Sequence, residues 1–146
     1  MRLTSKGRYA VMAMADLALE GGAERAAPLQ DIAVRQQISL SYLEQLFARL
    51  RRAGLVAGVR GPGGGYRLAR PAQEIAVADI VAAVNEPIQA TRCKDARGCM
   101  GKGARCVTHD LWEDLGRTIQ DYLAAVSLAD VVEGRVRAGP ETIAAE

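Results

Sequence analysis

Residues 29–54, LQDIAVRQQISLSYLEQLFARLRRAG, contain two segments of helical apolar period separated by a short turn. Leu29, Ile32 and Ala33 give the first segment a short apolar face, and Ser39 lies in the turn. The second segment stops at Gly54, a common helix terminator, and its apolar stripe comprises Leu40, Leu43, Leu46, Phe47 and Leu50. A helix, a short turn and a second helix form the arrangement with which many proteins enter the major groove of DNA.

The face opposite this stripe carries residue types that read bases or hold phosphates. At about 100° per residue, that face and its shoulders contain Ser41, Tyr42, Gln45, Arg49 and Arg52. Glu44 lies on the same helix and, if it meets the groove, can accept from a cytosine N4 amino group. Because Ser41-x-x-Glu44 also matches a capping box, these two residues could instead simply start the helix.

A glycine-rich hairpin is expected directly after these helices. The β-prone segments 55–59 and 66–68 flank Arg60-Gly-Pro-Gly-Gly-Gly65, which predicts a hairpin with a glycine tip. The glycine run lacks the Lys-Ser/Thr ending of a phosphate-binding loop, so a nucleotide site is not favoured. Arg60 and Arg67 flank the tip, where a narrow minor groove would attract arginine. With further helices expected near residues 5–20 and 75–84, the pattern predicts a winged helix-turn-helix domain over residues 1–84.

Charge is distributed unevenly along the chain. Residues 1–71 carry 11 Lys+Arg against 5 Asp+Glu, whereas residues 72–146 carry 8 against 12. The basic first half indicates an anionic partner, and double-stranded DNA is favoured over a membrane because no basic amphipathic helix or lipidation motif is present. Arg2 and Lys6 are expected to join the phosphate contacts. The sequence has neither an apolar run of membrane-spanning length nor a secretory leader, so a cytoplasmic location is expected.

All three cysteines and the only histidine lie close together as Cys93-x5-Cys99-x6-Cys106-x2-His109. Thiolate and imidazole ligands suit zinc or an iron-sulfur cluster, and spacing alone leaves both open. An odd number of cysteines in a reducing compartment argues against a disulfide framework. With the one histidine committed to this loop, and with no Walker A or paired-carboxylate pattern, no catalytic constellation remains, and the chain is not expected to be an enzyme.

A long amphipathic helix is expected after the cysteine loop, with apolar residues at three- and four-residue spacings. They are Leu111, Trp112, Leu115, Ile119, Tyr122, Leu123 and Val126. A twin helix from a second copy is the expected cover, which predicts a homodimer. The fold class is therefore mostly α with a small β wing: a winged domain at 1–84, a ligand loop at 85–109, a dimerisation helix and following segment at 110–135, and a disordered tail at 136–146.

Four motifs carry a resemblance to a known family: MRLTSKGRYAV at 1–11, ISLSYLEQLF at 38–47, VRGPGGGY at 59–66 and ATRC at 90–93. They closely resemble the IscR family of bacterial iron-sulfur cluster regulators, and the match runs from residue 1 to about residue 135. The resemblance implies a homodimeric winged helix-turn-helix repressor that holds a 2Fe-2S cluster through Cys93, Cys99, Cys106 and His109. It also implies repression of cluster-assembly genes when the cluster is bound, a cluster-free form that acts on a second operator class, and a cluster-assembly scaffold as donor.

The ligand loop departs from the family pattern by one extra residue between Cys99 and Cys106, which Gly101 and Gly103 are expected to absorb. Related regulators hold a 4Fe-4S cluster with three cysteines and a non-cysteine ligand, so 4Fe-4S and zinc stay as alternatives. The Cys-x2-His end favours 2Fe-2S. Replacing one thiolate by histidine removes a negative charge and adds a ligand for which protons compete near its intrinsic pKa of about 6.5. Such a cluster should therefore be lost more easily than an all-cysteine cluster, as a sensor requires.

Overall fold

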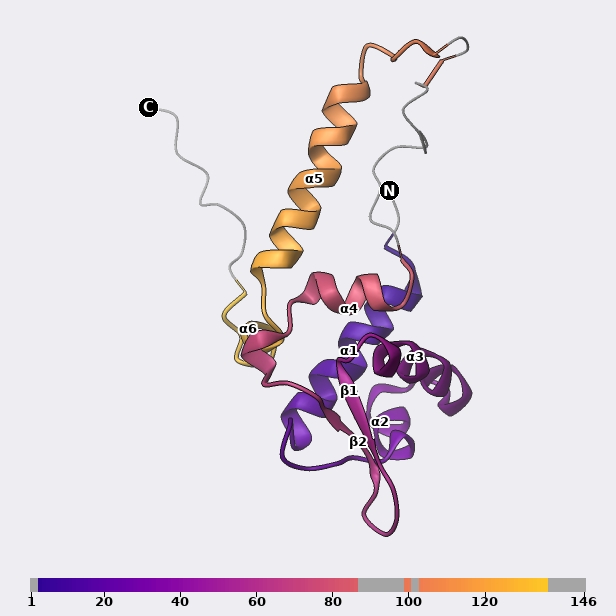
Figure 1. Cartoon of the computed structure of the whole chain (residues 1–146), viewed down its shortest axis with the longest axis vertical. Coiled ribbons are helices and arrows are strands. Elements are labelled where there is room, and N and C mark those ends of the chain that lie inside the picture. The colour runs from indigo at the N-terminus through magenta and orange to yellow at the C-terminus, as the bar shows by residue number, and fades with distance from the viewer. Residues whose placement is uncertain (1–2, 87–98, 101–102, 137–146) are drawn as a thin grey trace.

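The computed structural model describes residues 3–86, 99–100 and 103–136. It shows a helical body with a small two-stranded hairpin, from which one long helix projects (Figure 1). The elements in chain order are α1 (Ser5–Glu20), α2 (Leu29–Gln36), α3 (Leu40–Arg52), β1 (Val56–Val59), β2 (Gly65–Leu68), the 3-10 turn η1 (Ala72–Glu74), α4 (Val77–Ala83), α5 (His109–Ala125) and α6 (Leu128–Val132). No described helix is long and apolar enough to cross a membrane.

The core lies where α1 meets α2, α3 and the hairpin. The predicted stripe of α3 is buried as expected at Leu43, Leu46, Phe47 and Leu50. The Phe47 ring meets the edge of Tyr66 from β2, with centroids 5.1 Å apart, so the hairpin is packed directly against this helix. Burying a side chain of this size contributes about 1.5–3 kcal/mol, which makes the stripe a main source of stability.

The turn between α2 and α3 decides where the second helix begins. Gln37 adopts a left-handed backbone with φ 55°, and Ser39 is extended with its Oγ accepting from the Tyr42 N–H at 3.2 Å. Ser39 is therefore the N-cap of α3. The capping-box interpretation of Ser41 and Glu44 is wrong, because both residues already lie inside the helix.

The hairpin confirms the predicted wing. Its strands pair antiparallel, with Val56 opposite Leu68 and Val59 opposite Gly65. The tip uses left-handed glycines at Gly61 and Gly63, where φ is 92° and 74° and a side chain would be strained. The wing is also fastened to the body, because Tyr66 exchanges both backbone hydrogen bonds with Ala27.

The chain after α5 returns to the core, which the sequence pattern did not anticipate. Ser127 caps α6 by accepting from the Asp130 N–H, and Asp130 accepts in return from the Ser127 N–H. Leu128 is fully buried and its N–H donates to the carbonyl of Ile75 at 2.8 Å. The segment expected to follow a separate dimerisation helix is therefore built into the winged body. The tail expected at 136–146 lies outside the described residues from 137 onward.

Candidate DNA-binding and metal-binding sites

The outer face of α3 presents the residues expected to read DNA. Ser41, Glu44, Gln45 and Arg52 are exposed. Tyr42 is half-buried, because its ring meets the edge of Tyr9 from α1 with centroids 6.0 Å apart. Four of the expected groups are thus free to meet a ligand, and the Tyr42 ring also holds α3 against α1.

Arg49 has a structural contact that the sequence did not predict. Its Nη1 donates to the carbonyl of Val84 at 3.0 Å, which ties the last turn of α3 to the end of α4. The guanidinium keeps further N–H donors, so the expected phosphate contact remains a prediction. Arg49 consequently links α3, the helix expected to read DNA, to the point where the ligand loop leaves the body.

The other expected phosphate contacts come from separate parts of the chain. Arg60 is exposed next to the hairpin tip, and Lys6 is partly exposed in the first turn of α1. Arg2 lies outside the described residues. Arg67, the second arginine expected beside the tip, donates from Nη1 to the Ala23 carbonyl at 3.2 Å and so holds the wing against the body.

Two of the four expected metal ligands are in direct contact. His109 is the first residue of α5, and its Nδ1 lies 2.8 Å from the Sγ of Cys99. Cys106 is half-buried, with its Sγ 3.7 Å from the Thr108 hydroxyl. Cys93 lies outside the described residues. The structure therefore brings together Cys99 and His109 from positions ten residues apart.

Local backbone turns shape this ligand region. The Met100 N–H donates to the Ala104 carbonyl at 3.1 Å, with Gly103 left-handed at φ 80°. The His109 N–H donates to the Cys106 carbonyl at 3.1 Å, which sets the spacing of the last two ligands. Gly101 lies outside the described residues, so the expectation that Gly101 and Gly103 absorb the additional residue of this loop stays a prediction.

The donor set fits a thiolate-binding metal or cluster. Ligand atoms on one tetrahedral metal lie about 3.5 Å apart, given metal–sulfur and metal–nitrogen distances of about 2.3 and 2.0 Å. The Cys99 Sγ and His109 Nδ1 atoms are 2.8 Å apart, so they need to move apart only slightly to reach that distance. These residues can therefore hold a metal without rebuilding the start of α5.

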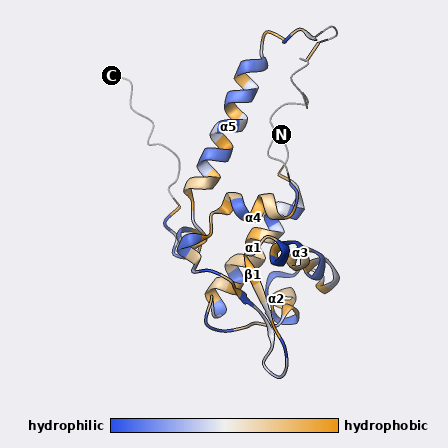
Figure 2. Cartoon of the chain, in the orientation of Figure 1, coloured by the Kyte–Doolittle hydropathy of each residue, from blue (hydrophilic) through white to orange (hydrophobic). Residues whose placement is uncertain are grey.

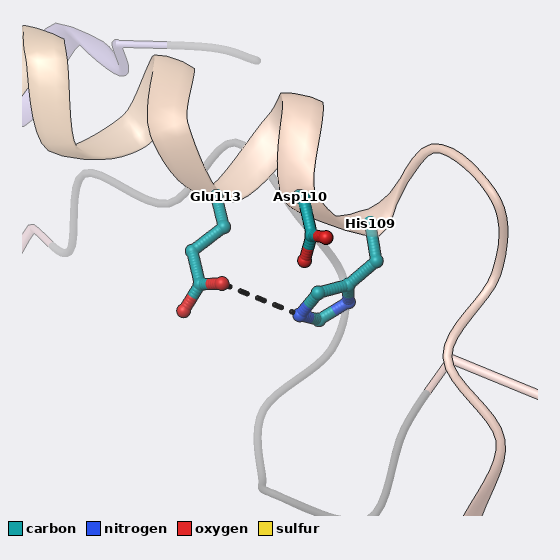
Figure 3. A group of neighbouring side chains, drawn as sticks. All are labelled: His109, Asp110 and Glu113. Atoms are coloured by element: carbon teal, nitrogen blue, oxygen red, sulfur yellow. Dashed lines mark ion pairs between the residues drawn. The ribbon is translucent and has the colours of Figure 1, made fainter.

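Two carboxylates beside His109 were missed by the sequence analysis. His109, Asp110 and Glu113 each offer a ligand atom, all within 4.8 Å of one another (Figure 3). Glu113 Oε2 lies 3.6 Å from His109 Nε2, whereas Asp110 pairs with Arg105 at 3.3 Å. The i, i+4 spacing of His109 and Glu113 on one helix was the available signal.

Glu86 is a second missed residue, at the stem of the ligand loop. It is 7% exposed, and its two carboxylate oxygens accept from the backbone N–H groups of Thr4 and Gly7. Gly7 leaves the space for this contact, because a Cβ there would collide with the carboxylate. The last described residue before Cys93 thus fastens the loop stem to the first turn of α1.

Together, the helix–turn–helix, the packed hairpin and the exposed face of α3 define a winged helix-turn-helix protein. The chain belongs to the Rrf2 family, whose model, described as "Iron-dependent Transcriptional regulator", matches residues 3–134. It is accordingly a DNA-binding transcriptional regulator, and this confirms the family resemblance, the fold class and the expectation that it is not an enzyme.

Individual relatives agree with this assignment. The chain is 58% identical over 135 residues to the HTH-type transcriptional regulator IscR of Serratia proteamaculans (strain 568), covering 92% of this chain and 81% of that protein. Among solved structures, T. potens IscR matches with 36% identity and a TM-score of 0.72, covering 97% of this chain and 93% of that one. CymR, the global cysteine regulator of B. subtilis, matches with 30% identity and a TM-score of 0.77, covering 92% and 98%.

Proposed function

We propose that this regulator senses an iron-sulfur cluster and binds operator DNA as a homodimer. A 2Fe-2S cluster held by Cys93, Cys99, Cys106 and His109 would make it repress cluster-assembly genes, and the cluster-free form would act on a second operator class. The observation that carries this proposal is the 2.8 Å contact between Cys99 Sγ and His109 Nδ1, because it joins two ligands of the expected set. The relatives named IscR support the same assignment.

The uncovered surface of α5 supports the homodimer. Four large apolar side chains on this helix are exposed in the single chain: Leu111 at 61%, Trp112 at 43%, Leu115 at 36% and Tyr122 at 48%. Figure 2 shows hydrophobic positions recurring along α5 as it leaves the body. Exposed apolar patches of this kind mark interaction sites, and a second α5 matches the patch in length and pattern.

The cluster would supply a ligand-dependent constraint on the loop, while the residues of this chain would transmit it. Cys106 and His109 lie next to the start of α5, and the sequence places Cys93 after the stem held by Glu86. Closing four ligands on one cluster would therefore fix the loop between the end of α4 and the start of α5. Cluster loss would release that constraint and bias the domain toward its other DNA-binding form.

The DNA partner is engaged, in this proposal, by α3, the wing and the first turn of α1. Lys6, Arg52 and Arg60 would neutralise phosphates, so operator affinity should fall steeply with salt, by about 0.9 log units per log unit of salt for each phosphate contact. We place the protein in the cytoplasm, with a cluster-assembly scaffold as the cluster donor. A salt-independent affinity would contradict this surface.

Anaerobic purification followed by absorption spectroscopy and metal analysis tests the cofactor. Equal iron and sulfide at about two of each per chain is the expected result, about four of each would indicate 4Fe-4S, and colourless protein with zinc would refute the sensor. Cys106→Ala and His109→Ala should lose the colour yet keep helical circular dichroism and dimeric mass. Asp114→Ala, an exposed change on the same helix, is the matched control. Unfolded metal-free protein would make the site structural.

A further inference from the structure

The two ring nitrogens of His109 face different partners. Nδ1 lies 2.8 Å from the sulfur of Cys99, and Nε2 lies 3.6 Å from a carboxylate oxygen of Glu113 one helical turn further along α5 (Figure 3). The imidazole is 11% exposed, so it is held between these groups, whereas Glu113 is half exposed. The Nδ1 side of the ring therefore faces Cys99, one of the expected ligands.

A neutral imidazole carries one N–H, and only its other nitrogen can bind a metal. A carboxylate accepts hydrogen bonds and repels a lone pair, so it favours the proton on the nitrogen that faces it. Glu113 therefore favours Nε2–H and leaves the lone pair of Nδ1 directed at the cysteine sulfur. We infer that Glu113 is a positioning residue that fixes the tautomer of His109 for metal ligation through Nδ1, an inference that rests on the proposed function.

Helix geometry gives this role to Glu113 and not to its acidic neighbours. Residues four apart lie on one face of a helix, so Glu113 stands beside His109. Asp114 lies a further 100° or so round the helix and pairs with Arg117 at 3.5 Å. Asp110 is paired with Arg105. Asp114 thus provides a control with the same charge on the same helix, on the exposed surface and away from His109.

Mutating a group that interacts with the free ring N–H of a metal-binding histidine typically weakens metal affinity by 10- to 100-fold. Because Glu113 is half exposed, we expect the lower end. Glu113→Ala should lose the cluster to a chelator such as EDTA about tenfold faster than the wild-type protein. The rate of cluster loss from Glu113→Gln should lie between these two, since the glutamine amide oxygen can still accept from Nε2–H. The rate for Asp114→Ala should match that of the wild type. Equal rates for all four proteins would overturn the inference.

A second measurement needs no cluster. His109 is the only histidine, so ¹⁵N-histidine labelling of tag-free, metal-free protein gives one assignable imidazole by nuclear magnetic resonance. At about pH 8.5 the wild type should show the Nε2–H tautomer, and Glu113→Ala should show a mixture of both tautomers. An Nδ1–H wild type, or an unchanged ratio in Glu113→Ala, would refute the role of Glu113. A wild type that binds no cluster would instead refute the proposed function.

Discussion

Removing the Glu86 carboxylate should loosen the first turn of α1. Glu86→Ala leaves the N–H groups of Thr4 and Gly7 without their acceptor. Gly7 is buried, so its N–H cannot turn to water, whereas Thr4 is exposed and can be resolvated. A buried unsatisfied donor costs about 1–3 kcal/mol, and a lost negative charge at a helix N-terminus adds about 0.3–1 kcal/mol. We expect a loss of about 2–3 kcal/mol.

A loss of this size should lower the melting temperature by about 4–12 °C for a chain of this length, at about 2–4 °C per kcal/mol. Thermal unfolding of metal-free protein by circular dichroism measures it. Glu74→Ala is the control, because Glu74 is an exposed carboxylate on η1. A melting temperature for Glu86→Ala within about 1 °C of that control would refute the assigned contact.

A double-mutant cycle sharpens this test. Gly7→Ala should destabilise the wild type, because the new Cβ collides with the Glu86 carboxylate. In the Glu86→Ala background the collision is absent, and alanine within a helix should be neutral or stabilising by up to about 1 kcal/mol. The sign of the Gly7→Ala effect should therefore reverse between the two backgrounds. The same direction in both would mean that the two residues do not meet.

Two further changes test the core and the DNA-reading face. Burial would raise the pKa of Asp16, but hydrogen bonds from Arg35 and Gln36 and the charge of Arg35 outweigh it and hold that pKa below its ordinary value. The stability that charged Asp16 contributes is present above its unfolded-state pKa of about 3.9 and is lost as the pH falls through the lower folded-state pKa. Asp16→Asn should therefore lower the free energy of unfolding by about 2–3 kcal/mol at pH 7. It should also weaken the fall of that free energy below about pH 4, as measured by urea titration. Glu44→Ala should let cluster-free protein bind the cluster-dependent operators, because it removes a carboxylate that is unpaired in the groove. The expected gain in binding free energy is about 1–3 kcal/mol, measured by fluorescence anisotropy with labelled operator DNA. A uniform loss on both operator classes would mean that Glu44 selects nothing.

The parts of the fold set by local pattern were predictable. α1 ends where Gly21 and Gly22 follow the apolar period, and the α3 stripe is buried as expected, because helical period and glycine stops are encoded within one segment. The start of α3 at Leu40, after a turn containing Ser39, was also predicted, whereas the alternative that Ser41 and Glu44 start the helix was wrong. Ser39 and Ser41 are equally good caps in sequence, and the left-handed turn at Gln37 chooses between them.

The features that depend on distant contacts were missed. α6 is too short to show a period, although Ser127-x-x-Asp130 was a readable capping box, and its place in the core depends on the backbone of Ile75. Glu86 meets Gly7 from 79 positions away, so no spacing rule could indicate it. The Cys99–His109 contact was predictable, since rare ligand types within one short loop have few other reasons to gather.

The arrangement of elements restricts how a cluster can influence DNA binding. α5 carries His109 at the end that points away from the winged body, whereas α3 lies within that body (Figure 1). α4 packs against both helices. Its C-terminal end is held by Arg49 from α3 at the Val84 carbonyl and by Glu86 at the first turn of α1. In a cluster-sensing protein, tension in the loop would therefore reach two DNA-binding elements at one place, residues 84–86, and α6 would anchor the other end of α5 in the core.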